Sequence, residues 1–141
     1  FNLIASASAV QWFERPSEIL KKWAGLLVSD GLLLFSGFLP DNFCEVRAAC
    51  GLGLDYFTAE QWQGWLEPYF DIKAFETAKY RLSFHHPREV LHHIRATGVG
   101  GVGAGCGNFR LAKFCRRYPK QDENSCELTY APFYVLAEKK K

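Results

Sequence analysis

An amide and an indole follow directly after the first apolar segment of the chain. Residues 1–10 carry no charged side chain, and Gln11 and Trp12 come immediately after them. This composition predicts a parallel strand over residues 2–9 that is covered on both faces. Ligands of open α/β sheets bind just outside the carboxyl ends of their strands. We therefore expect Gln11 and Trp12 to border a ligand site, although the same pattern also suits a core tryptophan beside a helix-capping glutamine.

Four histidines lie within nine residues, at His85, His86, His92 and His93. A helical metal site needs two such ligands on one face, three or four residues apart. His92 and His93 are adjacent and therefore diverge, and the other two precede Pro87, which suits the start of a helix. We expect capping and packing roles for them and no metal.

The stretch 98–107 is rich in glycine, and residues 98–103 match the pattern GxGxxG. A phosphate or cofactor loop of this type follows a buried strand, whereas residues 92–97 have the pattern of a helix. A circularly permuted enzyme, with Glu138 as the acid that holds a ribose, would rescue the motif. We favour a flexible glycine hinge instead.

Arg110, Lys113 and Arg117 share one stripe of a predicted helix, with Arg116 and Lys120 nearby. Such a stripe either steers an acidic partner toward the protein or is a solvated helix face.

Composition bounds the class of protein. The 141 residues suit one compact domain, and an aromatic content of 16% predicts either an aromatic-rich core or rings that line a cavity or a cut face. A net charge of +2 is too small to indicate nucleic acid, and no apolar run is long enough to cross a membrane. Five cysteines without a CxxC pair favour reduced thiols, and with no signal peptide before the fold we expect a cytoplasmic protein.

Periodicity predicts the order of elements. A helix that begins at Pro16 and a buried strand over residues 32–38 complete a right-handed βαβ unit with the first strand. A short helix starts at residues 40–42, and Thr58 opens another through a capping box.

The later part of the chain predicts two further strands. Residues 72–84 alternate, which indicates a single strand with Ala78, Tyr80, Leu82 and Phe84 on its inner face. Residues 128–137 are apolar throughout and indicate a central strand with a bulge at Pro132. The fold class is therefore α/β, with a mixed sheet of two parallel strands followed by an antiparallel pair and helices on both faces.

This order of elements resembles the class I S-adenosylmethionine-dependent methyltransferases from their fourth strand onward. The likeness narrows to the malonyl-acyl-carrier-protein O-methyltransferase family of biotin synthesis. Residues 1–12, FNLIASASAVQW, resemble the family strand FDLIxSNxAxQW, and residues 29–36 resemble its PGGxLxFS turn and strand. Residues 93–98 resemble its LKATG helix end, and residues 128–130 its final LTY strand. The four motifs in this order cover nearly the whole chain.

The resemblance implies a single partial domain over residues 1–141, with a helical cap segment and glycine-rich loop at residues 85–107. It implies that the last strand runs antiparallel between the second and third strands of this chain. It also implies S-adenosylmethionine as the cofactor and malonyl-acyl carrier protein as the partner, which the stripe of Arg110, Lys113 and Arg117 would help to dock.

The resemblance also assigns candidate site residues. Those that would border the cofactor are Ser6, Ala7, Gln11 and Trp12. Those that would contact the substrate are Arg95, then Arg47, with Phe38. Arginine holds a carboxylate through a two-pronged geometry, although an exposed arginine bonded to water or a surface acid fits the same sequence. No residue is assigned a catalytic role, because a malonyl carboxylate is already ionised.

Two elements of the family pattern are absent from this sequence: the glycine loop after the first strand and the acid that closes the second. We therefore expect a fragment that is inactive and binds no cofactor by itself. Alternative functions are methyl transfer to another small carboxylate, or a methyltransferase-like domain that only binds partners. We further expect the bare edge at residues 2–9 to self-associate or to be buried against a helix.

Overall fold

The computed structural model of the protein describes residues 1–51, 53–97, 108–122 and 125–141. Contacts divide the chain into two compact units. The first unit consists of Phe1–Asn42, Asp55–Lys79 and Ala131–Lys141, and the second of Phe43–Leu54 and Tyr80–Tyr130. The second unit is thus formed by two insertions into the sequence of the first. Within the described ranges, no helix is both long enough and apolar enough to cross a bilayer.

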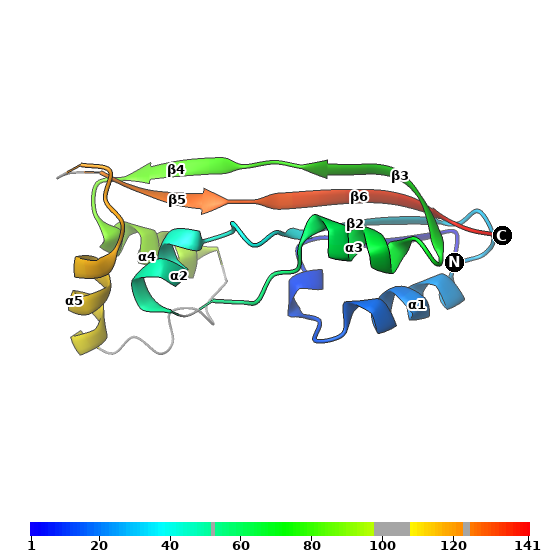
Figure 1. Ribbon diagram of the computed structural model, residues 1–141, viewed down its shortest axis with the longest axis horizontal. Helices are drawn as coiled ribbons and strands as arrows, with labels where there is room; N and C mark the ends of the chain where they lie inside the picture. The colour runs from blue at the N-terminus through cyan, green and yellow to red at the C-terminus, as the bar shows by residue number, and fades with distance from the viewer. Residues whose placement is uncertain (52, 98–107, 123–124) are drawn as a thin grey trace. The chain divides into compact units, whose positions relative to one another are not determined.

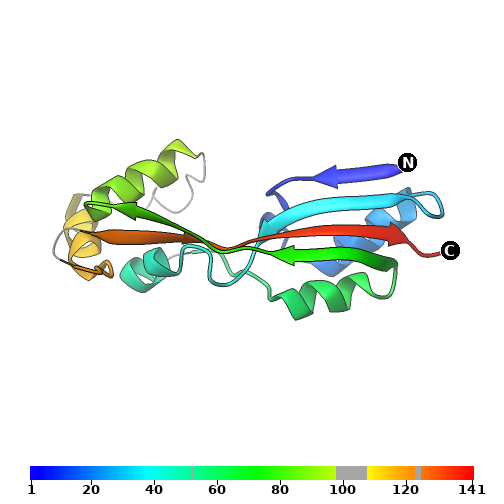
Figure 2. The ribbon, with the colours of Figure 1, turned by 90° about the horizontal axis from the view of Figure 1, so that it is seen from above.

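A four-stranded sheet forms the centre of the first unit, and Figure 2 shows its strands side by side. Its strands, in spatial order, are β1 (Leu3–Ser6), β2 (Leu32–Phe38), β6 (Pro132–Lys139) and β3 (Phe70–Thr77). β1 runs parallel to β2, whereas β6 runs antiparallel to both β2 and β3. The predicted parallel pair and the predicted central position of the last strand are both confirmed.

Helices α1 (Pro16–Leu26) and α3 (Ala59–Leu66) lie on the same side of this sheet (Figure 1). The covered face presents apolar side chains from β2 and β6 to the helices, and they form one core. The members of that core from the two strands are Leu33, Phe35, Phe133, Val135 and Ala137. On the opposite face Leu34 and Tyr134 remain 47% and 45% exposed. Among the described residues of this unit, helices cover only one face of the sheet. The sequence predicted cover on both faces, and the other face is open in this structure.

The core of the first unit is rich in aromatic rings, which accounts for the aromatic composition. Trp62 is buried, and its ring lies 5.5 Å from Phe35, 5.3 Å from Phe133 and 5.5 Å from Trp65, measured between centroids. Aromatic pairs at these distances add to the stabilisation that area burial provides. The aromatic-rich core that composition predicted is therefore found in this unit.

β1 is shorter than the predicted strand over residues 2–9. Ser8 has a φ of 50°, which turns the chain out of the strand, and the 3₁₀ helix η1 (Val10–Trp12) follows. L-residues adopt positive φ only at a cost, so such a residue marks a defined turn. The strand therefore ends at Ser6 and the site region begins with a sharp bend.

The predicted single strand over residues 72–84 is two strands. β3 ends at Thr77, and β4 (Tyr80–Phe84) pairs with β5 (Cys126–Tyr130) in a separate two-stranded sheet. The alternation that predicted an inner face continues across the break, but Tyr80 is 55% exposed and Leu82 is also exposed. Alternation alone does not distinguish one long strand from two consecutive strands that pair with different partners.

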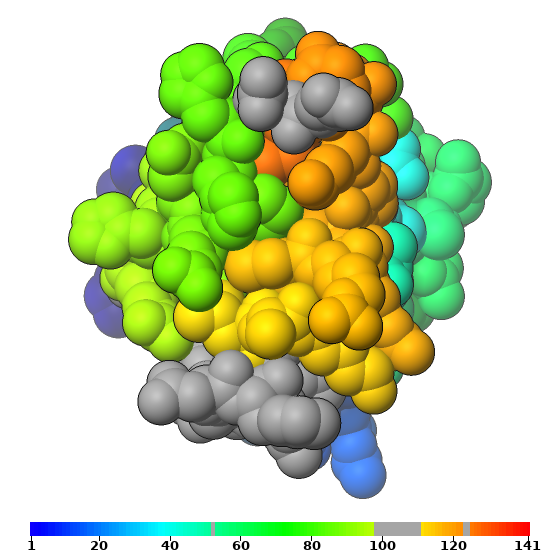
Figure 3. Space-filling view, turned by 90° about the vertical axis from the view of Figure 1, so that its left-hand side faces the viewer, coloured from blue at the N-terminus to red at the C-terminus, as the bar shows by residue number. Residues whose placement is uncertain are grey.

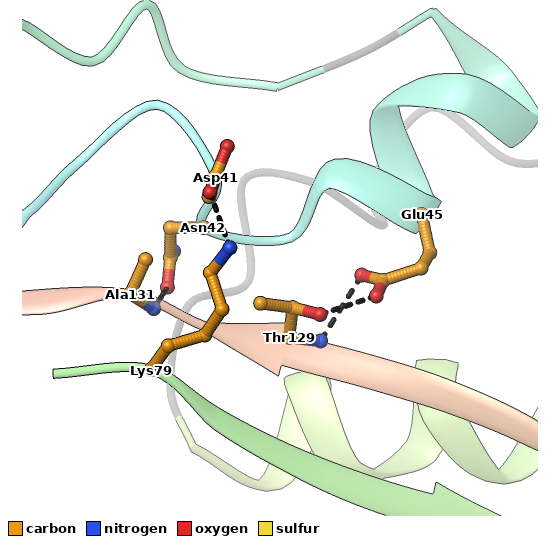
Figure 4. Close-up of polar contacts among 6 residues, drawn as sticks. All are labelled: Asp41, Asn42, Glu45, Lys79, Thr129 and Ala131. Carbon is orange, nitrogen blue, oxygen red and sulfur yellow. Dashed lines mark hydrogen bonds and ion pairs between the residues drawn. The ribbon is translucent and has the colours of Figure 1, made fainter.

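The predicted strand over residues 128–137 is likewise divided, at Ala131. The Ala131 N–H donates to Asn42 Oδ1 at 3.2 Å (Figure 4), and its carbonyl accepts from the Leu39 N–H at 2.9 Å. These loop contacts use the backbone groups that would otherwise continue a ladder. Pro132 then begins β6, where a strand tolerates proline, so the predicted bulge at Pro132 is wrong. The register shift in this sheet lies in β3 instead, between Ile72 and Ala74.

The second unit packs helices α2 (Cys44–Cys50), α4 (Pro87–Ala96) and α5 (Asn108–Arg117) with the β4–β5 pair around its own core. Its fully buried members include Val46, Val90, Ile94 and Leu128. Glu45, in the first turn of α2, accepts hydrogen bonds from the Thr129 N–H at 3.0 Å and the Thr129 hydroxyl at 2.5 Å (Figure 4). One carboxylate thereby fixes the shorter insertion to the longer one.

We expect Glu45→Ala to loosen the second unit selectively, because it leaves the buried Thr129 N–H and hydroxyl without an acceptor. Hydrogen bonds to a charged acceptor contribute about 2 kcal/mol. If residues 126–130 exchange their amide hydrogens through opening of the whole unit, that loss makes their exchange roughly 30-fold faster in the variant. All four tryptophans belong to the first unit, so urea unfolding followed by tryptophan fluorescence should shift less.

The control is Glu14→Ala, which removes an exposed carboxylate of the first unit. Equal exchange rates at residues 126–130 in both variants would show that Glu45 does not hold the two insertions together.

Candidate functional site

The carboxyl ends of β1 and β2 are held together by a double hydrogen bond. The Ser8 N–H donates to the Ser36 carbonyl at 3.1 Å and to Ser36 Oγ at 3.2 Å. This contact positions Ser6, which lies opposite Phe35 in the ladder, and the bend that follows. Ser36 thus supports the predicted site although the sequence gave no indication of its role. The role of a serine within a strand becomes visible only when the neighbouring strand is known.

A hollow of about 350 Å³ opens beside these strand ends. The residues that line it are Ala5, Ser6, Ala7, Leu34, Phe35, Ser36 and Tyr134. Two of the predicted cofactor residues, Ser6 and Ala7, therefore share a hollow with Tyr134 of β6, which the sequence did not suggest. The lining carries few polar groups besides the two serine hydroxyls and the tyrosine, so it suits an apolar group better than a charged one.

Gln11 and Trp12 belong to η1, directly after the bend at Ser8. Gln11 Nε2 donates to the Ser8 carbonyl at 2.5 Å, while its Oε1 is buried and has no hydrogen-bond partner among the described residues. An acceptor in that state costs free energy unless a donor reaches it. Trp12 is 51% exposed, and Arg15, not Gln11, occupies the N-cap of α1. The interpretation of this pair as a core tryptophan and a capping glutamine is therefore wrong.

The candidate substrate residues occupy different places. Phe38 ends β2 and packs edge-on against Tyr56 in the first unit. Arg47 lies on α2 in the second unit and donates from its guanidinium to the Leu54 carbonyl, so it closes the loop that follows the helix. Arg95 lies in the last turn of α4 and is exposed. Among the described residues, Arg95 does not occur in a salt bridge with a surface acid.

The basic stripe lies on α5, and Figure 3 shows this helix in yellow and orange on the surface of the second unit. Lys113 and Arg117 are exposed, as are Arg116 in the same helix and Lys120 just after it. The helix includes Arg110, whose side chain lies outside the described residues. The structure thus leaves at least two of the three predicted basic side chains available to a partner.

Two of the four histidines have the capping and packing roles that the sequence predicted. His86 Nδ1 accepts from the Arg88 N–H and caps α4, and His93 Nε2 lies 2.9 Å from the Tyr130 hydroxyl. Burial raises the pKa of Tyr130 above its usual value. No group of three potential metal ligands occurs among the residues that the structure describes. The glycine-rich stretch 98–107 lies outside them.

A second, larger hollow of about 540 Å³ lies where the loop after β2 meets the start of α3. Its rim carries the ion pair between Lys79 and Asp41, 2.6 Å apart (Figure 4), and the carboxylate of Glu60. Thr58 caps α3 at the same place and lowers the pKa of Glu60 through a side-chain hydrogen bond. The charges of this hollow compensate each other in part, and no sequence motif predicted it.

Solved structures with the same arrangement of elements define the class of fold. A putative methyltransferase from Bacillus halodurans matches all of this chain and 65% of its own, with a TM-score of 0.66 at 12% identity. The YcgJ protein of Bacillus subtilis matches all of this chain and 64% of its own, with a TM-score of 0.59 at 13% identity. The chain has the Rossmann-like methyltransferase fold, in the partial form that the sequence predicted.

Sequence comparison finds relatives that share one name. The malonyl-[acyl-carrier protein] O-methyltransferase of Bacteroides thetaiotaomicron is 38% identical over an alignment of 153 positions, which covers 99% of this chain and 59% of that protein. The protein of the same name from Haemophilus ducreyi is 38% identical over an alignment of 145 positions, which covers 99% of this chain and 55% of that protein. No family model matches the chain. The resemblance to malonyl-acyl-carrier-protein O-methyltransferases is therefore confirmed along nearly the whole chain, which spans between half and two thirds of these relatives.

We expect Thr58→Val to affect α3 in two ways, because the hydroxyl accepts from the Gln61 N–H at 3.3 Å and also bonds Glu60. Loss of an N-cap hydroxyl costs about 1 kcal/mol of stability. The pKa of Glu60 should rise toward its ordinary value. Because that pKa is lowered in the folded state, its stabilising contribution exists above the ordinary value and disappears as pH falls through the folded one. Thr58→Val should reduce this dependence, and the backbone hydrogen bond to Glu60 should preserve the rest of it.

The measurement is the carboxyl carbon chemical shift of Glu60, followed by NMR over roughly pH 2–7. Thr77→Val, which alters another threonine of the same hollow, is the control. An unchanged Glu60 titration in Thr58→Val would contradict the assigned cause.

Proposed function

We propose that this chain forms part of a methyltransferase that transfers a methyl group from S-adenosylmethionine to the free carboxylate of malonyl-acyl carrier protein, an early step of biotin synthesis in the cytoplasm. The observation that supports it best is the identity of 38% to relatives of that name over 99% of the chain. The fold also agrees with a methyltransferase. Its strands β1 and β2 are parallel, and ligands of open α/β sheets bind beside the carboxyl ends of such strands.

The proposed reaction needs no acid–base catalysis by the protein. S-adenosylmethionine supplies a methyl group on a positively charged sulfur, and an ionised carboxylate oxygen is the nucleophile. A bond forms between that oxygen and the methyl carbon while the bond from the carbon to sulfur breaks, and no proton moves. Holding donor and acceptor in line supplies most of the acceleration in such transfers. The assignment of roles therefore concerns binding residues and not a general base.

In this proposal Ser6, Ala7, Gln11 and Trp12 border the cofactor. The unsatisfied Oε1 of Gln11 and the exposed ring of Trp12 support it, since a bound molecule can provide a donor to the first and apolar cover to the second. Arg95 is the better candidate for the substrate carboxylate, because it is exposed whereas Arg47 already binds the Leu54 carbonyl. The chain alone is expected to be inactive, since it lacks the glycine loop and ribose acid of the family pattern.

A chimera tests the activity directly. Residues 1–141 would replace the matching part of the Bacteroides thetaiotaomicron relative, and methyl transfer from labelled S-adenosylmethionine would be measured. We expect product with malonyl-acyl carrier protein and none with acetyl-acyl carrier protein, which lacks the free carboxylate. A folded chimera that methylates free small dicarboxylates equally well would favour the alternative substrate class. One that binds partners without any transfer would favour a non-catalytic domain.

Docking of the acyl carrier protein makes a separate prediction. In the chimera, Lys113→Glu with Arg117→Glu should raise the KM for malonyl-acyl carrier protein about tenfold at low salt and leave kcat unchanged, because rim charges act mainly on association. The KM for malonyl-coenzyme A, a small substrate, should not change. Lys21→Glu with Lys22→Glu alters the same charge on exposed residues of α1. Equal effects of the two double variants would remove the docking role of α5.

A further inference from the structure

Val10, the first residue of η1, occupies a space that Gly37 of β2 leaves open. Its side chain is buried, with 1% of its surface exposed. A Cβ added at Gly37 would lie 2.6 Å from Val10 Cγ2 and 2.8 Å from Phe133 Cε1, closer than side chains approach in real proteins. Glycine is the residue that permits such a close approach. Val10 can therefore keep this place only because residue 37 has no side chain.

Ser36, the residue before Gly37, holds the bend that precedes η1. The Ser8 N–H donates to both the carbonyl and the Oγ of Ser36. Ser8 has a φ of 50°, a conformation that costs free energy in a residue other than glycine and persists only where its surroundings hold it. Ser36 supplies the hydrogen bonds and Gly37 supplies the space. Two consecutive residues of β2 thus fix the segment from Ser8 to Val10.

The place of Val10 decides how η1 is turned about its axis. A 3₁₀ helix has three residues per turn, so consecutive side chains point about 120° apart. With Val10 packed against β2, the side chains of Gln11 and Trp12 have to point elsewhere. Gln11 Nε2 donates back to the Ser8 carbonyl, and Trp12 is 51% exposed. The direction of the Trp12 indole is therefore set by a contact on another side of the helix.

Gly37 adjoins two groups of residues that can be observed separately. One is η1, which it contacts through Val10, and the other is the aromatic core, which it contacts through Phe133. Trp12 reports on the first group because it belongs to η1. Trp62 reports on the second, since its ring lies 5.3 Å from that of Phe133. The chain thus contains its own probe on each side of Gly37.

We propose that Ser36 and Gly37 are positioning residues of the cofactor site. This inference rests on the proposed function, in which η1 borders S-adenosylmethionine. Ser36 acts through the bend at Ser8, and Gly37 acts through Val10. Because holding donor and acceptor in line supplies most of the acceleration of such a transfer, a shift of η1 weakens cofactor binding although no residue of η1 has been changed.

The first experiment follows the fluorine NMR signals of residues 1–141 labelled with 5-fluorotryptophan, each assigned by replacing one tryptophan with phenylalanine. Gly37→Ala should shift the signals of Trp12 and Trp62. Adding Val10→Ala removes the closer of the two contacts. The Trp12 signal should then return to its position in Val10→Ala alone, while the Trp62 signal stays shifted. Gly64→Ala is the matched control, because a Cβ there meets nothing within 4 Å.

Ser36→Ala tests the hydrogen bond to the bend. The carbonyl of residue 36 still accepts from the Ser8 N–H, so we expect only about fivefold faster hydrogen exchange of that amide. Ser83→Ala alters an exposed serine of another strand, β4, and should leave the exchange of the Ser8 amide unchanged.

The effect on the cofactor site is measured by calorimetry in the chimera with the Bacteroides thetaiotaomicron relative, with S-adenosylhomocysteine as the probe. Gly37→Ala should weaken its binding roughly tenfold, since small displacements at such a site have large effects. Ser36→Ala should weaken it about threefold, and Gly64→Ala should not change it. The number of sites per chain should stay the same in all three variants, whereas a loss of folded protein would lower it.

Three results would overturn the proposal. The first is a Trp12 signal that Gly37→Ala does not move, or that Val10→Ala does not restore, because Gly37 would then act on the aromatic core alone. The second is equal affinity for S-adenosylhomocysteine with and without the substitutions, and the third is a folded chimera that does not bind it. If Gly37→Ala does not fold, Ser36→Ala against Ser83→Ala decides by the same readouts. A chimera that binds S-adenosylhomocysteine but transfers no methyl group would contradict the proposed function and leave this inference standing.

Discussion

The first unit depends on the two-sided pairing of β6. That strand pairs with β2 from Leu32 opposite Glu138 to Phe38 opposite Pro132, and with β3 along its other side. Because its backbone is satisfied on both flanks, its alternate side chains are fixed in direction. Phe133, Val135 and Ala137 consequently point to the helices and are fully buried. The parallel pair of β1 and β2 is therefore aligned by β6, which comes from the other end of the chain.

The second unit is held by different means. Its two insertions are far apart in sequence, and each is too short to bury a core by itself. Apolar contacts join Val46 to the α4 and α5 side chains, while the carboxylate of Glu45 binds both polar groups of Thr129. The Tyr118 hydroxyl donates to the Glu127 carbonyl at 2.7 Å, and burial raises its pKa far above the usual value. The polar groups of Thr129 and Tyr118 are thus paired, which is what burial requires.

Part of this architecture could be predicted from the sequence because local signals agree with the tertiary structure. The parallel pairing of β1 and β2, the capping box at Thr58 and the central position of β6 follow from apolar runs, turn residues and the family motifs. The divisions of the two later strands could not be predicted. The break at Ala131 depends on hydrogen bonds to Asn42 and Leu39, about 90 residues away along the chain. No local pattern carries that information.

The site residues show the same limit in another form. Ser6, Ala7, Gln11 and Trp12 could be chosen as candidates because they lie at or after the end of a strand. Ser36 and Tyr134 join Ser6 and Ala7 in one hollow only through strand order. Their geometry also rests on one ladder, since β1 is bonded to β2 along a single flank. A strand paired on one side can move relative to the sheet more easily than one paired on both. In the proposed function a methyl donor must be held in line, so the ladder from β1 to β2 and the contact of Ser8 with Ser36 set the positions of the residues that would hold it.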